Sequence, residues 1–270
     1  MKKKDKILSF DVDMTLLKDD DHCIPKSALE AIDEARQNNY ILIATGRDLD
    51  QKSNRFIVEQ VRPDAIVHSN GMKVTLEGKL IQDKHMEKSV CEGIIEFSKD
   101  YEMSVMTLIK GVQYYSNLEY LEEKFSKKFQ MPKRIKKSLS HISNADLSKV
   151  YSIGIVAKDE DAKKLQKAFP QIKISEVFHD FWYDVVVSGV TKAVGMEELF
   201  MHFNKSWEDV ISFGDSMNDY EIMSYSGYSV AMGNASKKVK DIADFVTDDV
   251  ENDGIAKAIL YLYKQNIISY

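Results

Sequence analysis

The sequence predicts an α/β protein in which a doubly wound parallel sheet is interrupted by an inserted α+β module. Short apolar runs alternate with amphipathic stretches at both ends of the chain, which is the rhythm of strands and crossover helices in a parallel sheet. Between these ends, short strands in pairs alternate with single helices, which is typical of an α+β module. A length of 270 residues suits two domains, since domains commonly span about 100–200 residues.

Three short apolar runs predict the first strands of the parallel sheet, because strands buried on both faces are apolar at successive positions. Periodic helical patterns separate these runs. The expected strands cover residues 7–10, 40–44 and 65–68, and the expected helices cover residues 26–38 and about 51–61. Gly71 and Gly78 then interrupt an alternating stretch, residues 72–82, which predicts a hairpin that leads out of the sheet.

The inserted module is expected from Lys84 to about Val186. Its helices are expected at 87–101, 118–128 and 160–169, and its strands near 104–109, 113–115, 151–157, 172–177 and 181–187. After Gly189 the parallel rhythm returns. The expected helices cover 192–203, 219–225 and a segment from 254, and the strands cover 209–213, 228–231 and 245–247. We therefore expect a discontinuous core, residues 1–83 and 187–270, around an inserted domain, residues 84–186.

Composition and charge exclude several classes of protein. The 37 basic and 43 acidic residues give a net charge of −6 with the acidic excess scattered, which argues against nucleic acid or anionic lipid as a partner. No apolar run approaches about 18 residues, and the first one is interrupted at Asp11, so neither a membrane span nor a secretion signal is expected. Cys23 and Cys91 form no framework, which fits a reducing compartment. We expect a cytoplasmic protein, and the sequence does not specify its oligomeric state.

Carboxylates gather at one edge of the predicted sheet. Asp11 and Asp13 directly follow the first strand, and Asp215 and Asp219 follow the strand at 209–213. If these two strands are neighbours, the order of strands reverses between them, and ligands of open α/β sheets bind at such a point. Because carboxylates at close range repel one another, a cation is expected with them. Mg²⁺ fits best, since it prefers oxygen ligands and is completed by water and substrate phosphate.

Two further segments point to the same edge. Thr45-Gly46-Arg47 follows the second strand and brings a hydroxyl group and a tight turn there. Lys192 follows Thr191, a good N-cap residue, so it lies in the first turn of a helix. The helix dipole disfavours a cation at that position by about 0.3–1 kcal/mol, which favours a functional role for the lysine.

Together these segments resemble the four motifs of the haloacid dehalogenase superfamily. The motifs are Asp11-Val12-Asp13-Met14-Thr15, Thr45-Gly46-Arg47, Lys192 and Gly214-Asp215-Ser216-Met217-Asn218-Asp219, in the family's order and spacing. The insertion before Lys192 is similar to the α/β cap of the Cof-type, class IIB phosphatases. The resemblance implies a Rossmann-like core and a cap that determines substrate specificity. The chain departs from the family at Met14, where Gly is usual, and a side chain there restricts the backbone of that turn.

The resemblance also implies roles for individual residues. Asp11 would attack phosphorus and form an aspartyl-phosphate, and Asp13 would protonate the leaving alcohol and then activate water. Thr45 and Lys192 would bind the transferring phosphoryl group. Mg²⁺ would be held by Asp11, Asp215 and the backbone carbonyl of Asp13, with Asp219 binding through water or orienting the other ligands. The positions that usually line the substrate are Gly46, Arg47, Asn70, Gly71 and Asn218.

The resemblance implies a Mg²⁺-dependent hydrolase that acts on a small phosphate monoester. Sugar phosphates and cofactor phosphates such as pyridoxal phosphate or flavin mononucleotide are the expected substrates. Two alternatives remain open. A phosphomutase would use the same aspartyl-phosphate but return the phosphoryl group to a sugar, and a receiver-like binding module would accept phosphate without turnover.

Overall fold

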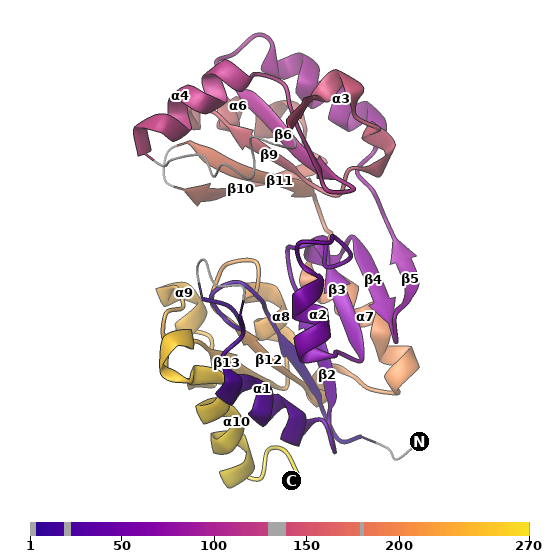
Figure 1. Cartoon of the computed structure of the whole chain (residues 1–270), viewed down its shortest axis with the longest axis vertical. Helices are drawn as coiled ribbons and strands as arrows, with labels where there is room; N and C mark the ends of the chain where they lie inside the picture. The colour runs from indigo at the N-terminus through magenta and orange to yellow at the C-terminus, as the bar shows by residue number, and fades with distance from the viewer. Residues whose placement is uncertain (1–3, 19–22, 129–138, 179–180, 270) are drawn as a thin grey trace. The chain divides into compact units, whose positions relative to one another are not determined.

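The computed structural model of the chain describes residues 4–18, 23–128, 139–178 and 181–269. It divides into two compact units (Figure 1). The core unit comprises Met1–Asp83 and Val190–Tyr270, and the inserted unit comprises Lys84–Gly189. The inserted unit ends at Gly189 rather than at the expected residue 186, since its last strand pairs with its neighbour as far as Val187.

The core unit is built on one twisted sheet with the strand order β14-β13-β12-β1-β2-β3-β4-β5. The strands from β14 to β3 are parallel, and β4 and β5 form an antiparallel hairpin at the end. The bounds are β1 Ile7–Phe10, β2 Tyr40–Ala44, β3 Ala65–His68, β4 Lys73–Leu76, β5 Lys79–Asp83, β12 Val210–Gly214, β13 Tyr228–Ala231 and β14 Phe245–Val246. The strand order reverses between β1 and β12, which is the point where ligands bind in such sheets.

Helices cover the core sheet in the doubly wound manner expected from the sequence. Their bounds are α1 Lys26–Ala35, α2 Arg55–Val61, α7 Lys192–Phe203, α8 Tyr220–Tyr225, α9 Lys237–Lys240 and α10 Gly254–Lys264. Helix α1 contacts α2 and α10, whereas α7 contacts α8. Helix α1 buries Ala28, Ile32 and Ala35, which recur at helical spacing and so form one apolar stripe. The predicted α/β fold is confirmed.

Two helices are shorter than the sequence predicted. Helix α1 ends at Ala35 instead of Asn38, and the buried Asn39 side chain donates to the Ala35 carbonyl at 2.9 Å. Helix α2 begins at Arg55 instead of Gln51, because the preceding turn is fixed by Asn54, whose side-chain amide donates to the Asp48 carbonyl at 2.9 Å. Side-chain hydrogen bonds to backbone groups compete with helix in both places.

The inserted unit contains a mostly antiparallel sheet with the order β10-β11-β9-β6-β7-β8. Its strands are β6 Ser104–Ile109, β7 Val112–Tyr115, β8 Leu139–His141, β9 Ile153–Val156, β10 Ile172–Phe178 and β11 Trp182–Val187, and its helices are α3 Lys88–Ser98, α4 Leu118–Lys128 and α6 Asp159–Ala168. Apolar residues of α3 and α6 join one buried cluster with the sheet, and α4 supplies Tyr120 and Leu121 to a second. The sequence did not predict β8, which pairs in parallel with β7.

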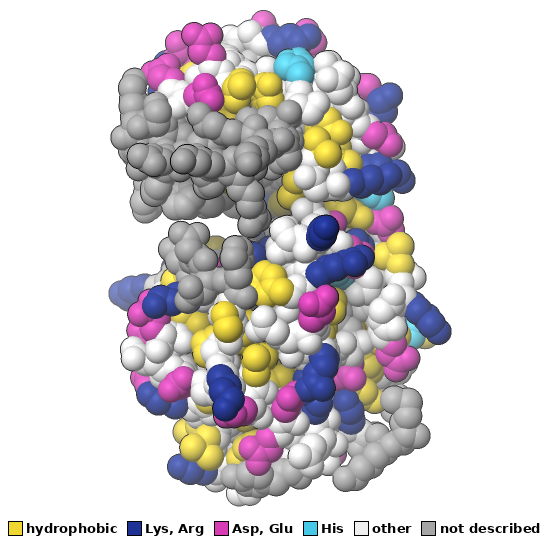
Figure 2. Space-filling model, viewed as in Figure 1, with side chains coloured by type: hydrophobic (Ala, Val, Ile, Leu, Met, Phe, Trp, Pro, Cys, Tyr) yellow, Lys and Arg dark blue, Asp and Glu magenta, His cyan; other side chains and the backbone are white. Residues whose placement is uncertain are grey.

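The distribution of charged side chains and the character of the described helices agree with what the composition predicted. On the face drawn in Figure 2, acidic and basic side chains are interspersed in each unit. Among the described residues, none of the helices combines the length and the apolar character that crossing a membrane requires.

Candidate active site

The candidate site lies where the strand order of the core sheet reverses. Strand β1 pairs with β12 on one side and β2 on the other, with Phe10 opposite Phe213. The Asp11 amide continues this pairing and donates to the Phe213 carbonyl at 3.0 Å. The loops after β1 and β12 therefore leave the sheet side by side, which brings Asp11 close to the Asp215 loop.

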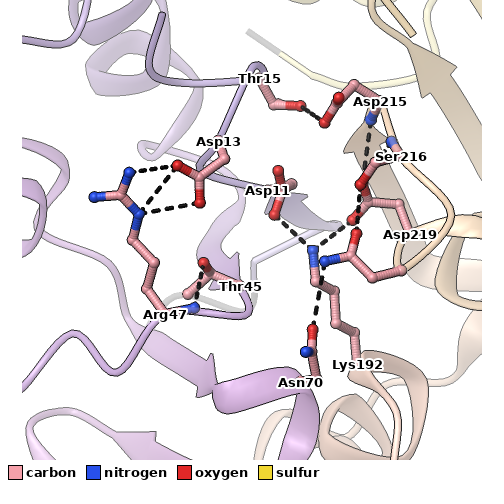
Figure 3. Close-up of polar contacts among 11 residues, drawn as sticks. Asp11, Asp13, Thr15, Thr45, Arg47, Asn70, Lys192, Asp215, Ser216 and Asp219 are labelled. Atoms are coloured by element: carbon pink, nitrogen blue, oxygen red, sulfur yellow. Dashed lines mark hydrogen bonds and ion pairs between the residues drawn. The ribbon is translucent and has the colours of Figure 1, made fainter. Parts of the chain in front are cut away.

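Lys192 connects two carboxylates at the centre of the site (Figure 3). Its Nζ lies 2.6 Å from Oδ1 of Asp11 and 2.6 Å from Oδ1 of Asp219, and all three side chains are buried. Burial of an ammonium group is costly unless negative partners compensate it. The two carboxylates provide this compensation and hold the lysine in one orientation.

Close packing of glycines brings Lys192 to this place. Helix α7 begins at Lys192, capped by the Thr191 hydroxyl, which accepts from the Val194 amide at 3.4 Å. A Cβ atom on Gly71, which has a φ of +99°, would lie 2.1 Å from the Thr191 carbonyl oxygen. A Cβ atom on Gly195 would lie 2.9 Å from the Gly71 Cα. Gly71 therefore allows the helix to begin directly against the loop that follows β3, and its observed role is one of packing.

Asp219 orients the loop after β12 as well as Lys192. Its Oδ2 accepts hydrogen bonds from the amides of Asp215 and Ser216, each at 3.1 Å. A Cβ atom on Gly214 would lie 2.6 Å from the Asp219 Cγ, so glycine is required for this close approach. Both oxygens of Asp219 thus have protein partners, and its geometry is that of an orienting residue.

Burial changes the titration of the charged groups. Burial raises the pKa of Asp11 well above its ordinary value, and the charge of Asp219 adds to this effect while Lys192 opposes it. Burial and the Asp219 charge also raise the pKa of Asp215 to about 7. Burial disfavours the charged form of Lys192, but Asp11 and Asp219 outweigh it and raise the pKa of the lysine. The three carboxylates of Asp11, Asp215 and Asp219 therefore carry more negative charge than the single ammonium group of Lys192 compensates.

The excess of carboxylates fits a hard metal ion. One oxygen each from Asp11, Asp215 and Asp219 lies within 4.8 Å of the others. An all-oxygen donor set of this kind suits Mg²⁺. A divalent cation there would lower the raised pKa values by favouring the charged carboxylates. The donor set and its charge are therefore compatible with the metal that the sequence predicted.

Asp13 lies apart from these carboxylates. Its half-exposed side chain accepts from Nε of Arg47 at 3.0 and 3.1 Å and also pairs with Nη2 of Arg47 (Figure 3). Arg47 in turn donates to Oδ1 of Asn54 at 3.4 Å. The Asp13 carboxylate thus faces Arg47 in this structure, and any metal contact of Asp13 would come from its backbone.

The remaining predicted residues form a polar rim around the same edge. Thr45 is buried, and its Oγ1 accepts from the Arg47 amide at 3.1 Å. The Asn218 side chain donates to Oδ1 of Asn70 at 3.4 Å, which connects the loops after β12 and β3. A Cβ atom on Gly46 would lie 3.4 Å from the Asn70 side chain, which is ordinary van der Waals contact, so Gly46 lies directly beside Asn70. The structure thus brings all of these segments to one edge of the core sheet.

The comparisons with known proteins agree with this geometry. The family model for haloacid dehalogenase-like hydrolases matches residues 8–259. The chain belongs to this family. YitU of Bacillus subtilis (strain 168), named 5-amino-6-(5-phospho-D-ribitylamino)uracil phosphatase, is 26% identical over 274 residues, which cover 95% of this chain and 97% of the relative.

Solved structures of haloacid dehalogenase-like proteins share the fold along nearly the whole chain. The subclass IIB sugar phosphatase BT4131 matches with a TM-score of 0.79 at 25% identity, over 95% of this chain and 98% of the other. BT1666 from Bacteroides thetaiotaomicron matches with a TM-score of 0.83 at 24% identity, over 96% of each chain. The predicted Cof-type, class IIB assignment is confirmed, and with it the predicted class of enzyme, a hydrolase of phosphate monoesters.

The haloacid dehalogenase-like turn after Asp13 is built here without its usual glycine. Met14 occupies the left-handed region with a φ of +60°, which costs an L-residue about 1–2 kcal/mol. The Met14 amide donates to the Leu17 carbonyl at 2.7 Å, and the Met14 carbonyl accepts from the Asn234 side chain at 2.8 Å. The turn therefore has the shape that glycine would allow, and hydrogen bonds on both sides of Met14 hold it.

Sequence reasoning missed Thr15, Ser216 and Asn234. Thr15 belongs to the first motif, and its hydroxyl donates to Oδ1 of Asp215 at 3.4 Å. Ser216 belongs to the last motif, and its Oγ donates to Oδ1 of Asn218 at 2.7 Å. Position within a motif was the available signal for these two. Asn234 lies outside every motif, so only the fold reveals its contact with Met14.

Proposed function

We propose that this hydrolase is a Mg²⁺-dependent phosphatase that acts on small phosphate monoesters through an aspartyl-phosphate on Asp11. The observation that carries the proposal is the position of the Asp11 carboxylate at the end of β1, with Oδ1 fixed 2.6 Å from Lys192. Within the described part of the chain, its Oδ2 accepts no hydrogen bond. A nucleophile needs this combination of a fixed direction and an available oxygen.

The reaction divides into two displacements. Oδ2 of Asp11 forms a bond to phosphorus while the ester oxygen leaves and takes a proton from Asp13. Asp13 then removes a proton from water, which attacks phosphorus, releases inorganic phosphate and restores the Asp11 carboxylate. In the first displacement Lys192 and the Thr45 hydroxyl stabilise the negative charge on the phosphoryl oxygens.

When substrate binds, Arg47 would release the Asp13 carboxylate and bind the substrate phosphate instead. An ion pair as exposed as theirs contributes only about 0.2–1 kcal/mol, so an incoming phosphate can replace the carboxylate at low cost. Arginine also binds phosphate in a bidentate manner. Release from Arg47 leaves the Asp13 side chain available to the leaving group.

Mg²⁺ would be held by Asp11, Asp215 and the backbone carbonyl of Asp13. When bound, it supplies positive charge to the phosphoryl oxygens and the carboxylates. We assign Asp219 to orienting Lys192 and the Asp215 loop, because both of its oxygens already accept hydrogen bonds from them.

The binding of Mg²⁺ is expected to weaken as the pH falls from 8 to 6. The pKa of Asp215 is raised to about 7 in the metal-free protein, so below this pH a proton occupies the carboxylate and competes with the cation. At one pH unit below the pKa this competition weakens the apparent affinity about tenfold. The shift in Tm caused by Mg²⁺, followed at both pH values, measures this. A shift that is equal at the two pH values would contradict the assignment of Asp215.

Sugar phosphates and phosphorylated cofactors are the proposed substrate class. YitU is named for a phosphorylated ribityl compound and BT4131 is a sugar phosphatase, and both substrates are phosphate esters of polyhydroxylated chains. We propose that the inserted unit selects among such leaving groups, because it resembles the cap of the class IIB phosphatases, which determines substrate specificity.

Phosphate release from a panel of esters tests the proposal. Sugar phosphates, pyridoxal phosphate, flavin mononucleotide, the ribityl phosphate and a chromogenic aryl phosphate are each incubated with and without Mg²⁺. We expect inorganic phosphate only with Mg²⁺. Isomerised sugar phosphate without phosphate release would establish the mutase instead. Phosphorylation of the protein that stops at one equivalent would establish the receiver-like module.

A further inference from the structure

We propose that Asn234 is a positioning residue that holds the turn carrying Asp13 in its active shape. This inference rests on the proposed function of Asp13. The Asn234 side chain spans two segments: its Nδ2 donates to the Met14 carbonyl at 2.8 Å, and its Oδ1 accepts from the Val250 amide at 3.3 Å. Both functional groups of the carboxamide therefore have backbone partners, which fixes its orientation.

The loop that carries Asn234 is itself anchored to the site. The Met232 amide donates to the Gly214 carbonyl at 3.0 Å, and the Ser236 amide donates to the Asp215 carbonyl at 2.9 Å. Asn234 lies between these two anchors. It thus connects the turn after β1 to the same loop that supports Asp215. This connection keeps the distance between the Asp13 turn and the Asp215 loop constant.

The backbone of Met14 explains why this tie matters. Peptide groups are planar and trans, so the hydrogen bond from the Met14 amide to the Leu17 carbonyl directs the Asp13 carbonyl to the opposite side. That orientation requires Met14 to stay in the left-handed region, which is unfavourable for a residue with a side chain. The Asn234 bond holds the next peptide group and thereby stabilises the unfavourable conformation. Without it, the Asp13 carbonyl and side chain would lose their fixed direction.

A comparison of the Asn234→Ala substitution in two backgrounds tests the inference. In the natural background we expect kcat to fall about tenfold with little change in KM, and the Mg²⁺ concentration that half-maximally raises Tm to increase several-fold. In the Met14→Gly background we expect the same substitution to change both quantities less than about threefold, because glycine adopts the left-handed conformation unaided. Asn234→Asp keeps an oxygen that accepts from the Val250 amide, removes the donor to the Met14 carbonyl and adds a negative charge. It replaces Asn234→Ala if that variant does not fold, and the difference between the two backgrounds then isolates the lost donor, because the added charge is common to both.

Asn39→Ala is the matched control. The Asn39 side chain also donates to a backbone carbonyl through its Nδ2, that of Ala35 at 2.9 Å, but within the core. It is expected to lower resistance to urea without changing kcat or the Mg²⁺ midpoint. The inference fails if Asn234→Ala behaves like this control, or if its effects are equal in both backgrounds. If the natural protein releases no phosphate from any ester, the proposed function fails, and the Mg²⁺ midpoints still decide the role of Asn234.

Discussion

Replacing Asp11 with Asn is expected to lower kcat by roughly 10,000-fold or more, the scale on which enzymes lose activity when a covalent nucleophile is removed. An amide oxygen is a poor nucleophile, so the aspartyl-phosphate does not form. The fold should persist, because Lys192 retains Asp219 as a partner at 2.6 Å and the Asn side chain is nearly isosteric. Phosphate release under saturating substrate and Mg²⁺ measures the loss, and mass spectrometry of the quenched enzyme measures phosphorylation at Asp11.

Asp33→Asn is the control for the change in charge. Asp33 lies on α1 and pairs with Arg36 and Arg62 on the surface. This variant should keep full turnover. Undiminished turnover by Asp11→Asn, or phosphorylation at another residue, would refute the nucleophile assignment.

Replacing Lys192 with Met is expected to lower kcat about 100- to 1,000-fold, the usual effect of removing one group that stabilises transition-state charge. The same change leaves Asp11 and Asp219 buried without their cation. Breaking a buried ion pair from one side typically costs about 3–5 kcal/mol, so the metal-free variant should unfold at lower urea concentration. Mg²⁺ should restore part of this stability, because the cation compensates the same carboxylates.

Lys205→Met separates the catalytic effect from the loss of stability. Lys205 is also largely buried, and it donates to the Asp5 carbonyl at 2.6 Å and pairs with Asp209 at 3.5 Å, in a part of the core unit remote from the carboxylate cluster. It should lose stability and keep kcat. A Lys192→Met variant with normal kcat and lowered stability would reduce Lys192 to a structural role.

The sequence alone determined the order of the elements and the edge of the sheet at which the candidate site residues gather. The strands at 7–10, 40–44 and 65–68 have the predicted bounds, because strands buried on both faces are continuous apolar runs, and this property is local. The carboxylates directly follow such strands, so their place at the carboxyl edge also follows from local pattern. Strand β8 escaped prediction, since an edge strand of three residues carries too little pattern of its own.

Only the tertiary structure decided which side chains meet. That Lys192 contacts Asp11 and Asp219, that Asp13 faces Arg47, and that Asn234 holds Met14 depends on how closely segments distant in sequence approach one another. Those approaches are set by glycines such as Gly71 and Gly214, whose missing side chains leave room for a neighbouring backbone or carboxylate. A motif records which residues are present, whereas the direction of each side chain results from packing between elements that the motif does not contain.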